Sequence, residues 1–180
     1  MGKFNIYFRQ KHFFLFLLCF CSSCVLVNFK QPQPIDTINE KMYPRALQGS
    51  FVSQDNDTIT IGESSFKIGL QQSRDKLESY LSDTSVLRKD NNYFFLNLKN
   101  DSLWNIYVLK IQNDSTFSVL TIDASNVAKI ERLTKITGVK VMTDGKDKID
   151  GYIVNPTKPE FYNMIDDTLF EETIKCKRIK

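Results

Sequence analysis

The sequence predicts an α+β fold, in which an antiparallel β-meander is followed by a β-α-β tail with two main helices. Two observations support the meander: apolar, β-branched and aromatic runs recur between residues 86 and 122, and Asn, Asp and Ser clusters at 90–92, 100–102 and 113–115 separate them. Two later segments show helical periodicity with capping residues, which supports the tail. A meander that curls into a partial barrel is an alternative form of the same prediction.

Three regions are expected along the 180 residues: a cleaved signal peptide over 1–23, a lipid anchor and tether over 24–45, and a single globular α+β domain over 46–180. The tether is predicted from Lys30–Pro34, because its prolines favour extended backbone and cannot donate to a ladder. A chain of about 150 residues buries ~70% of its unfolded surface, so one core suffices for the rest.

In the first third of the domain, Phe51–Val52 and Thr58–Ile61 flank the turn residues 55–57 and predict a hairpin. Ser65–Ile68 predicts a further strand. From Gln71 to Leu81 the apolar period changes, which predicts a short helix. The segment 35–45 is ambiguous between these states.

The meander itself is predicted at Val86–Leu87, Tyr93–Leu98, Trp104–Ile111 and Phe117–Ile122. Trp104–Ile111 is apolar at nearly every position rather than at alternate ones. We therefore expect that part of the sheet to be covered on both faces.

In the tail, Asn126 is expected to cap a helix whose apolar stripe includes Ile130 and Leu133. Strands are predicted at 139–142 and 152–154. The Thr157–Glu160 segment has the capping-box pattern of a second helix, with Pro159 in its first turn. A last strand over 171–179 carries several lysines, which is typical of an edge strand.

The first 24 residues have the layout of an export signal. Three basic residues precede the apolar run Phe13–Cys21, and small residues then precede Cys24. The apolar run is short for a bilayer span, which needs ~20 residues. An uncleaved signal anchor, or ordinary secretion that leaves Cys24 as a free thiol, are the alternatives.

The Cys21-Ser22-Ser23-Cys24 end of the leader resembles the lipobox of prokaryotic membrane lipoproteins. The resemblance implies cleavage before Cys24, a diacylglyceryl thioether on its sulfur and an acyl chain such as palmitate on its amine. The membrane is then a partner through the lipid anchor, since two or three chains hold a protein stably. Val25, where many inner-membrane lipoproteins carry Asp, favours the outer membrane, with the domain facing the periplasm.

Removal of the leader changes the composition. It takes away three of the 24 basic residues, none of the 21 acidic ones and His12, the only histidine. The remaining chain is neutral, so no basic field for nucleic acid is expected. Without histidine, no Ser-His-Asp site and no metal site is predicted. The chain has no P-loop or dinucleotide-binding motif, so no cofactor is predicted either. Cys176, the last thiol, is expected to face the core.

The segment Leu47-Gln48-Gly49-Ser50-Phe51 resembles the Gly-x-Trp opening of lipocalin-like barrels, with Phe51 in the position of the tryptophan. The resemblance implies a barrel that encloses a small apolar ligand. Helices that cover the sheet would argue against such a barrel.

Four aromatic residues on adjacent predicted strands form a candidate binding face: Tyr93, Phe95, Trp104 and Tyr107. With no nucleophile or phosphate motif, the sequence favours a non-enzymatic binding or structural module of the cell envelope. Its partner would be an envelope protein or a small ligand. The alternatives are a lipocalin-like carrier of an apolar ligand and an envelope hydrolase that depends on carboxylates alone.

Overall fold

The computed structural model of the protein describes residues 25–69, 76–144 and 147–179. The predicted fold class is confirmed: within these ranges a large, mostly antiparallel sheet is accompanied by two helices. The strands are β1 (Leu26–Phe29), β2 (Asn39–Glu40), β3 (Gly49–Ser53), β4 (Thr58–Ile61), β5 (Ser65–Gly69), β6 (Lys76–Tyr80), β7 (Ser85–Asp90), β8 (Tyr93–Asn100), β9 (Leu103–Asn113), β10 (Thr116–Ile122), β11 (Val139–Thr143), β12 (Ile149–Val154) and β13 (Phe170–Arg178). The helices are α2 (Val127–Ile136) and α3 (Lys158–Asp166).

The long strand β9 is the centre of the sheet. One of its edges pairs with β8 along most of its length, and β7 and then β2 follow β8. Its other edge pairs with β1 at Trp104 and with β10 from Val108 onward. The sheet therefore splits along this edge into a small wing, β1-β12-β11, and a longer arm, β10-β13-β3-β4-β5-β6.

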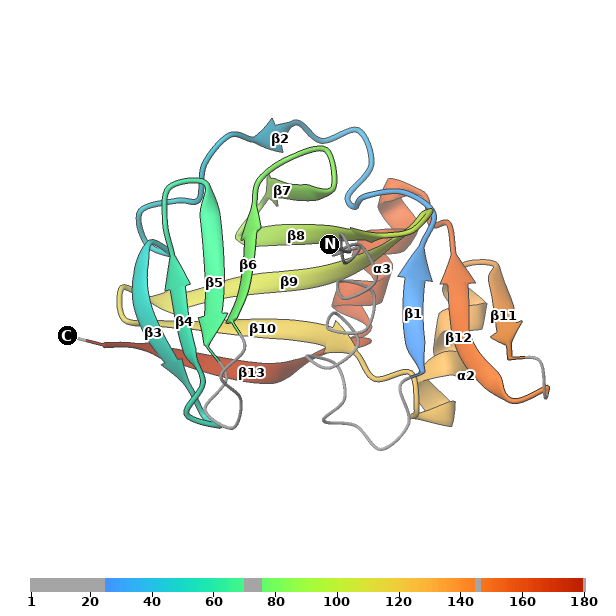
Figure 1. Ribbon diagram of the computed structural model, residues 1–180. Helices are drawn as coiled ribbons and strands as arrows, with labels where there is room; N and C mark the ends of the chain where they lie inside the picture. The colour runs from blue at the N-terminus through green and yellow to red at the C-terminus, as the bar shows by residue number, and fades with distance from the viewer. Residues whose placement is uncertain (1–24, 70–75, 145–146, 180) are drawn as a thin grey trace, which may run out of the picture.

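The longer arm curls back on itself, so that β3 to β6 lie in front of β8, β9 and β10 in Figure 1. The meander thus takes the partial-barrel form, which we call the half-barrel. Helices α2 and α3 lie beside the wing, at the opposite end of the sheet from the curl (Figure 1).

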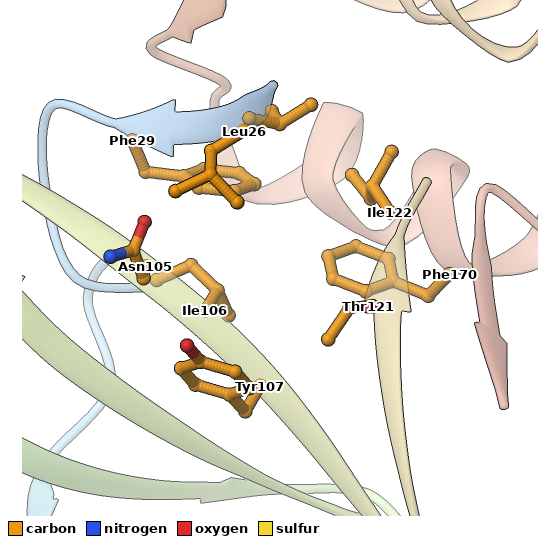
Figure 2. Close-up of a pocket in the computed structure, with 9 residues that line it drawn as sticks. Leu26, Phe29, Asn105, Ile106, Tyr107, Thr121, Ile122 and Phe170 are labelled. Carbon is orange, nitrogen blue, oxygen red and sulfur yellow. The ribbon is translucent and has the colours of Figure 1, made fainter. Parts of the chain in front are cut away.

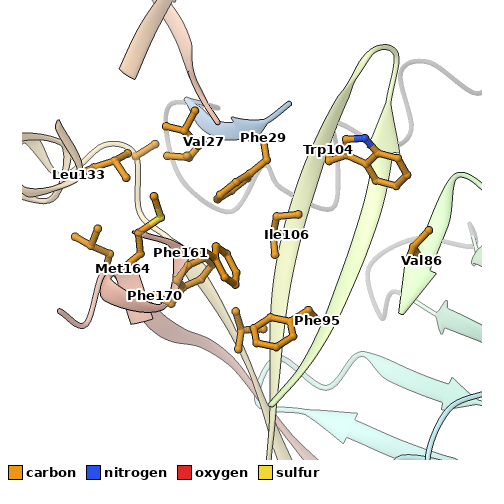
Figure 3. Packing of buried hydrophobic residues seen from close by; sticks show 14 residues of the cluster. Val27, Phe29, Val86, Phe95, Trp104, Ile106, Leu133, Phe161, Met164 and Phe170 are labelled. Carbon is orange, nitrogen blue, oxygen red and sulfur yellow. The ribbon is translucent and has the colours of Figure 1, made fainter. Parts of the chain in front are cut away.

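Two apolar cores lie on opposite faces of β8 and β9, as the apolar run Trp104–Ile111 predicts. Because side chains alternate along a strand, Phe95 faces one core while Phe94 and Leu96 face the other. The helix-side core contains Val27, Phe29, Val86, Phe95, Trp104, Ile106, Val108, Ala124, Leu133, Val154, Phe161, Met164, Leu169 and Phe170 (Figure 3). The barrel core contains Tyr43, Leu47, Phe51, Ile59, Ile61, Phe66, Leu87, Phe94, Leu96, Leu98, Leu109, Phe117 and Cys176.

The predicted tether over 24–45 is wrong for the residues that the structure describes. Leu26–Phe29 forms β1, which pairs in parallel with β12 and places Val27 and Phe29 in the helix-side core. Gln33, in the middle of the polar stretch, is fully buried. The globular domain therefore begins at β1 rather than at residue 46.

A side-chain amide and a guanidinium make hydrogen bonds to the backbone N–H and carbonyl groups of this proline-rich stretch. The N–H of Gln33 donates to Asn97 Oδ1 at 2.6 Å, and its carbonyl accepts from Asn97 Nδ2 at 3.0 Å. Arg88 donates through one nitrogen to the carbonyls of Pro32 and Pro34, at 2.6 and 2.7 Å. These partners allow a segment without ladder donors to be buried.

The predicted helix over Gln71–Leu81 is also wrong where it can be compared. Lys76–Tyr80 is the strand β6, while residues 71–75 lie outside the described ranges. Leu77 pairs with Ile68 of β5 and packs against the barrel core. Residues 76–80 form a strand because they pair with the free edge of β5 and because Leu77 packs on the barrel core. These contacts outweigh the weak helical periodicity of the local sequence.

Both predicted helix caps are confirmed. The side chain of Asn126 accepts a hydrogen bond from the backbone of Lys129 at the start of α2. At the start of α3, Thr157 and Glu160 form the reciprocal capping box, with a proline in the first turn. These contacts satisfy backbone donors that a helix start otherwise leaves open.

Replacing Thr157 by Ala is expected to lower the free energy of unfolding by about 1 kcal/mol, because the helix loses its N-cap oxygen. Urea unfolding followed by circular dichroism measures this loss. The control is Thr134→Ala in the exposed interior of α2, where alanine is a better helix former and stability should not fall. Equal effects of the two substitutions would contradict the capping role.

Candidate functional site

The four aromatic residues predicted as a binding face do not share one face. Tyr93, Phe95 and Trp104 pack in or against the helix-side core, with the Tyr93 and Phe95 rings 6.2 Å apart. Tyr107 packs against the barrel core on the opposite side of β9. Tyr107 lies three positions after Trp104, and side chains alternate along a strand, so the sequence already indicates opposite faces.

The interior of the half-barrel contains an apolar cavity of about 80 Å³, which we call the inner cavity. Every side chain in its wall is aliphatic or aromatic. Besides Tyr43, the wall residues belong to β4, β5, β8, β9, β10 and β13. An apolar wall of this kind accepts apolar groups. The wall consists of Tyr43, Ile59, Ile61, Phe66, Ile68, Leu96, Leu98, Tyr107, Leu109, Phe117, Val119 and Ile174.

Tyr43 occupies a special position in this wall, because it also lines a cleft outside the half-barrel. Its backbone is fixed on both sides: the N–H donates to the Glu63 carbonyl at 2.8 Å, and the carbonyl accepts from Gln48 Nε2 at 2.7 Å. The side chain is 1% exposed, and its hydroxyl has no hydrogen-bond partner. Burial accordingly raises the pKa of the Tyr43 phenol.

The cleft on the other side of Tyr43, which we call the outer cleft, has a volume of about 630 Å³ and a mixed polar lining. Lys89 contributes to it, with its ammonium 5.6 Å from the centre of the Phe94 ring. Glu40, Met42, Tyr43, Pro44, Arg45, Gln48, Glu63, Lys89 and Phe94 line it. The inner cavity and the outer cleft thus form an apolar compartment and a polar compartment that share Tyr43.

A third, smaller pocket of about 60 Å³ lies where β1 and β10 separate along the edge of β9 (Figure 2). Leu26 and Phe29 form one side of it, and Ile122 and Phe170 form another. Asn105 also lines it and is 5% exposed, and its Nδ2 has no partner. The pocket has room for a few water-sized groups, and Asn105 offers such a group a donor.

The outer cleft contains two carboxylates, Glu40 and Glu63. A hydrolase that works with carboxylates alone needs two of them facing one substrate. The alternative function as such a hydrolase would use this cleft, and it stays a prediction. Among the described residues, no group of three or more His, Cys, Asp or Glu side chains could hold a metal ion.

Cys176 lies in the barrel core, as predicted for a small core-facing residue. Burial raises the pKa of its thiol to about 12. The thiolate, which is the reactive form, is therefore scarce at neutral pH.

Cys24, the predicted lipidation site, lies outside the described residues. Between Val25 and Ile179, as far as the structure describes that stretch, no helix has the length and apolar character that a membrane span requires.

No protein-family model matches this chain, and neither the curated proteins nor the solved structures provide a match. The function is therefore argued from the geometry of the chain itself.

Proposed function

We propose that this protein is a lipid-anchored lipoprotein of the cell envelope, held by Cys24, that binds a small amphipathic molecule in the half-barrel without transforming it. The observation that carries the binding role is the wholly apolar inner cavity, whose wall includes Tyr43, a residue that also lines the outer cleft and whose buried hydroxyl has no partner. The leader supports the anchoring, and Val25 after Cys24 favours attachment to the outer membrane with the domain facing the periplasm.

The volumes define what part of a ligand fits where. Small-molecule sites usually measure ~300–1,000 Å³, so the inner cavity, at about 80 Å³, takes only a short apolar group. The outer cleft, at about 630 Å³, has room for the remainder. The matching ligand has a short chain or small ring at one end and a polar group at the other.

Tyr43 supplies specificity for such a ligand. A buried hydroxyl without a partner costs about 1–3 kcal/mol, and an oxygen acceptor near the middle of the ligand would recover it. Arg45 and Lys89 in the outer cleft offer further donors to the polar end. A purely hydrocarbon ligand would leave the Tyr43 hydroxyl without an acceptor and would make no hydrogen bond to Arg45 or Lys89.

The cavity is tested by filling it. Val119 lines the inner cavity, and Val119→Phe places a larger ring there. We expect this variant to lose at least ~90% of photolabelling by glycerol monobutyrate that carries a diazirine on its short acyl chain, assayed on the membrane-bound protein. In the unaltered protein, peptide mapping should place the label on β4, β5, β8–β10 and β13, the strands that form the wall of the inner cavity.

The matched control is Val52→Phe. Val52 follows Phe51 in β3 and therefore points away from the barrel core, so labelling of this variant should equal that of the unaltered protein. Labelling that is undiminished in Val119→Phe, or reduced equally in both variants, contradicts the cavity as the binding site.

A further inference from the structure

The fold leaves almost no slack between the lipidated residue and the packed domain. Val25 directly follows Cys24 in the sequence, and it already packs against the helix-side core. Consecutive Cα atoms are ~3.8 Å apart, so an acylated Cys24 is covalently attached within a few ångströms of that core. The chain offers no flexible tether that would let the domain turn freely above the bilayer.

The sheet register identifies the part of the domain that lies next to this attachment point. Leu26 is paired with Gly151 near the start of β12, and Gly151 is paired in turn with Met142 near the end of β11. Helix α2 reaches β11 through residues 137 and 138 alone, so the two run in opposite directions and α2 begins where β11 ends. Figure 1 shows these four ends together at the bottom of the view.

We call this region the anchor edge: the starts of β1, β12 and α2 and the end of β11. Two large apolar side chains on it are exposed, Val127 at 71% and Ile149 at 41%, and Val141, in the middle of β11 beside this edge, is exposed at 48%. Val127 opens α2, and Ile149 opens β12. Transfer of such side chains from water into the boundary of a bilayer is favourable.

The charges at this edge indicate which lipid property matters. The sequence of the β11–β12 hairpin contains Asp144, Asp147 and Asp150 beside Lys146 and Lys148, and Asp123 precedes α2. This composition does not favour an anionic surface. The contact is therefore an apolar one that zwitterionic lipid supports.

From these observations we infer that the anchor edge is a membrane-docking surface, which lies directly on the lipid bilayer and fixes the orientation of the domain. The inference rests on the proposed lipidation of Cys24. It also places the ligand site: β2 and the β4–β5 turn, which carry Glu40 and Glu63 of the outer cleft, lie at the top of Figure 1. These parts of the outer cleft therefore lie at the end of the domain opposite the anchor edge.

The test uses the lipidated protein in vesicles of phosphatidylcholine. Val127→Cys and Ile149→Cys each place a thiol for the environment-sensitive dye NBD on the anchor edge, and Ile38→Cys, at an 89% exposed position between β1 and β2, is the matched control. Lipids with a doxyl quencher near the headgroup should quench the dye at least twofold at 127 and 149 and leave it unchanged at 38.

Two failures are distinguishable in the same samples, because intact mass spectrometry reports the state of Cys24. An acylated, vesicle-bound protein that shows no quenching at 127 and 149, or equal quenching at 38, overturns the docking surface and leaves the anchor in place. A protein without acyl groups on Cys24 overturns the anchor and the docking surface together.

Discussion

Replacing Phe29 by Ala is expected to lower the free energy of unfolding by about 3–5 kcal/mol, the usual cost of removing a buried phenylalanine ring. Phe29 is 1% exposed and meets Phe161 edge to face, with ring centres 6.1 Å apart. Its backbone lies between Val154 of β12 and Trp104 of β9. The substitution thus leaves a cavity where the wing of the sheet joins the half-barrel and α3.

Urea unfolding followed by the fluorescence of Trp104 measures this effect, since the indole belongs to the same core. The matched control is Ile38→Ala, which lies in the same segment 24–45 but is 89% exposed. It should change stability by no more than ~0.5 kcal/mol. If Phe29→Ala behaved like Ile38→Ala, the segment would be a tether after all and β1 would not be part of the domain.

The second large effect concerns the anchor. Cys24→Ala removes the only thiol that the lipobox resemblance marks for acylation, so incorporation of labelled palmitate should fall to background. Each buried acyl methylene contributes ~0.8 kcal/mol, and two or three chains make release negligible. We expect the variant to appear in the soluble fraction or as an unprocessed precursor.

The control for this loss is Cys176→Ala, which alters a thiol that is buried in the barrel core. Its palmitate labelling and membrane fractionation should match the unaltered protein. Undiminished labelling and membrane retention of Cys24→Ala would show that another residue, or a signal anchor, holds the protein.

Features with local causes were predicted correctly from the sequence. The capping box of α3 depends on residues three apart, and both of its hydrogen bonds are present. Asn91 and Asp101, in predicted turns, adopt positive φ angles of 51° and 53°. Asn and Asp tolerate that conformation, which is why such clusters mark the ends of strands.

Features with distant causes were missed. β1 is only four residues long, and its partner β12 lies more than 120 residues away in the chain. No local pattern reports such a pairing. Likewise, the lysines of β13 suggested an edge strand, yet β13 lies between β10 and β3 inside the sheet. One face of β13 packs on the barrel core, and the lysine side chains lie on the other face, in solvent. Charged residues are therefore compatible with an internal strand that is covered on one face only.

The candidate ligand site depends on the same non-local geometry. The wall of the inner cavity draws on residues from Tyr43 to Ile174, so no spacing along the chain identifies it. Tyr43 falls in the segment 35–45, whose sequence pattern is ambiguous. Of the four aromatic residues in the predicted binding face, only Tyr107 could have been assigned to the opposite face from the sequence. It lies three positions after Trp104, and side chains alternate along a strand.

The central claim is that acylated Cys24 is the first residue of the mature protein. Intact mass spectrometry of the protein extracted from membranes tests this claim most directly. The account predicts a mass equal to residues 24–180 plus a diacylglyceryl group and, with full processing, one further acyl chain on the amine. The mass of the unprocessed chain, or of a chain that begins at Cys24 without lipid, would contradict it.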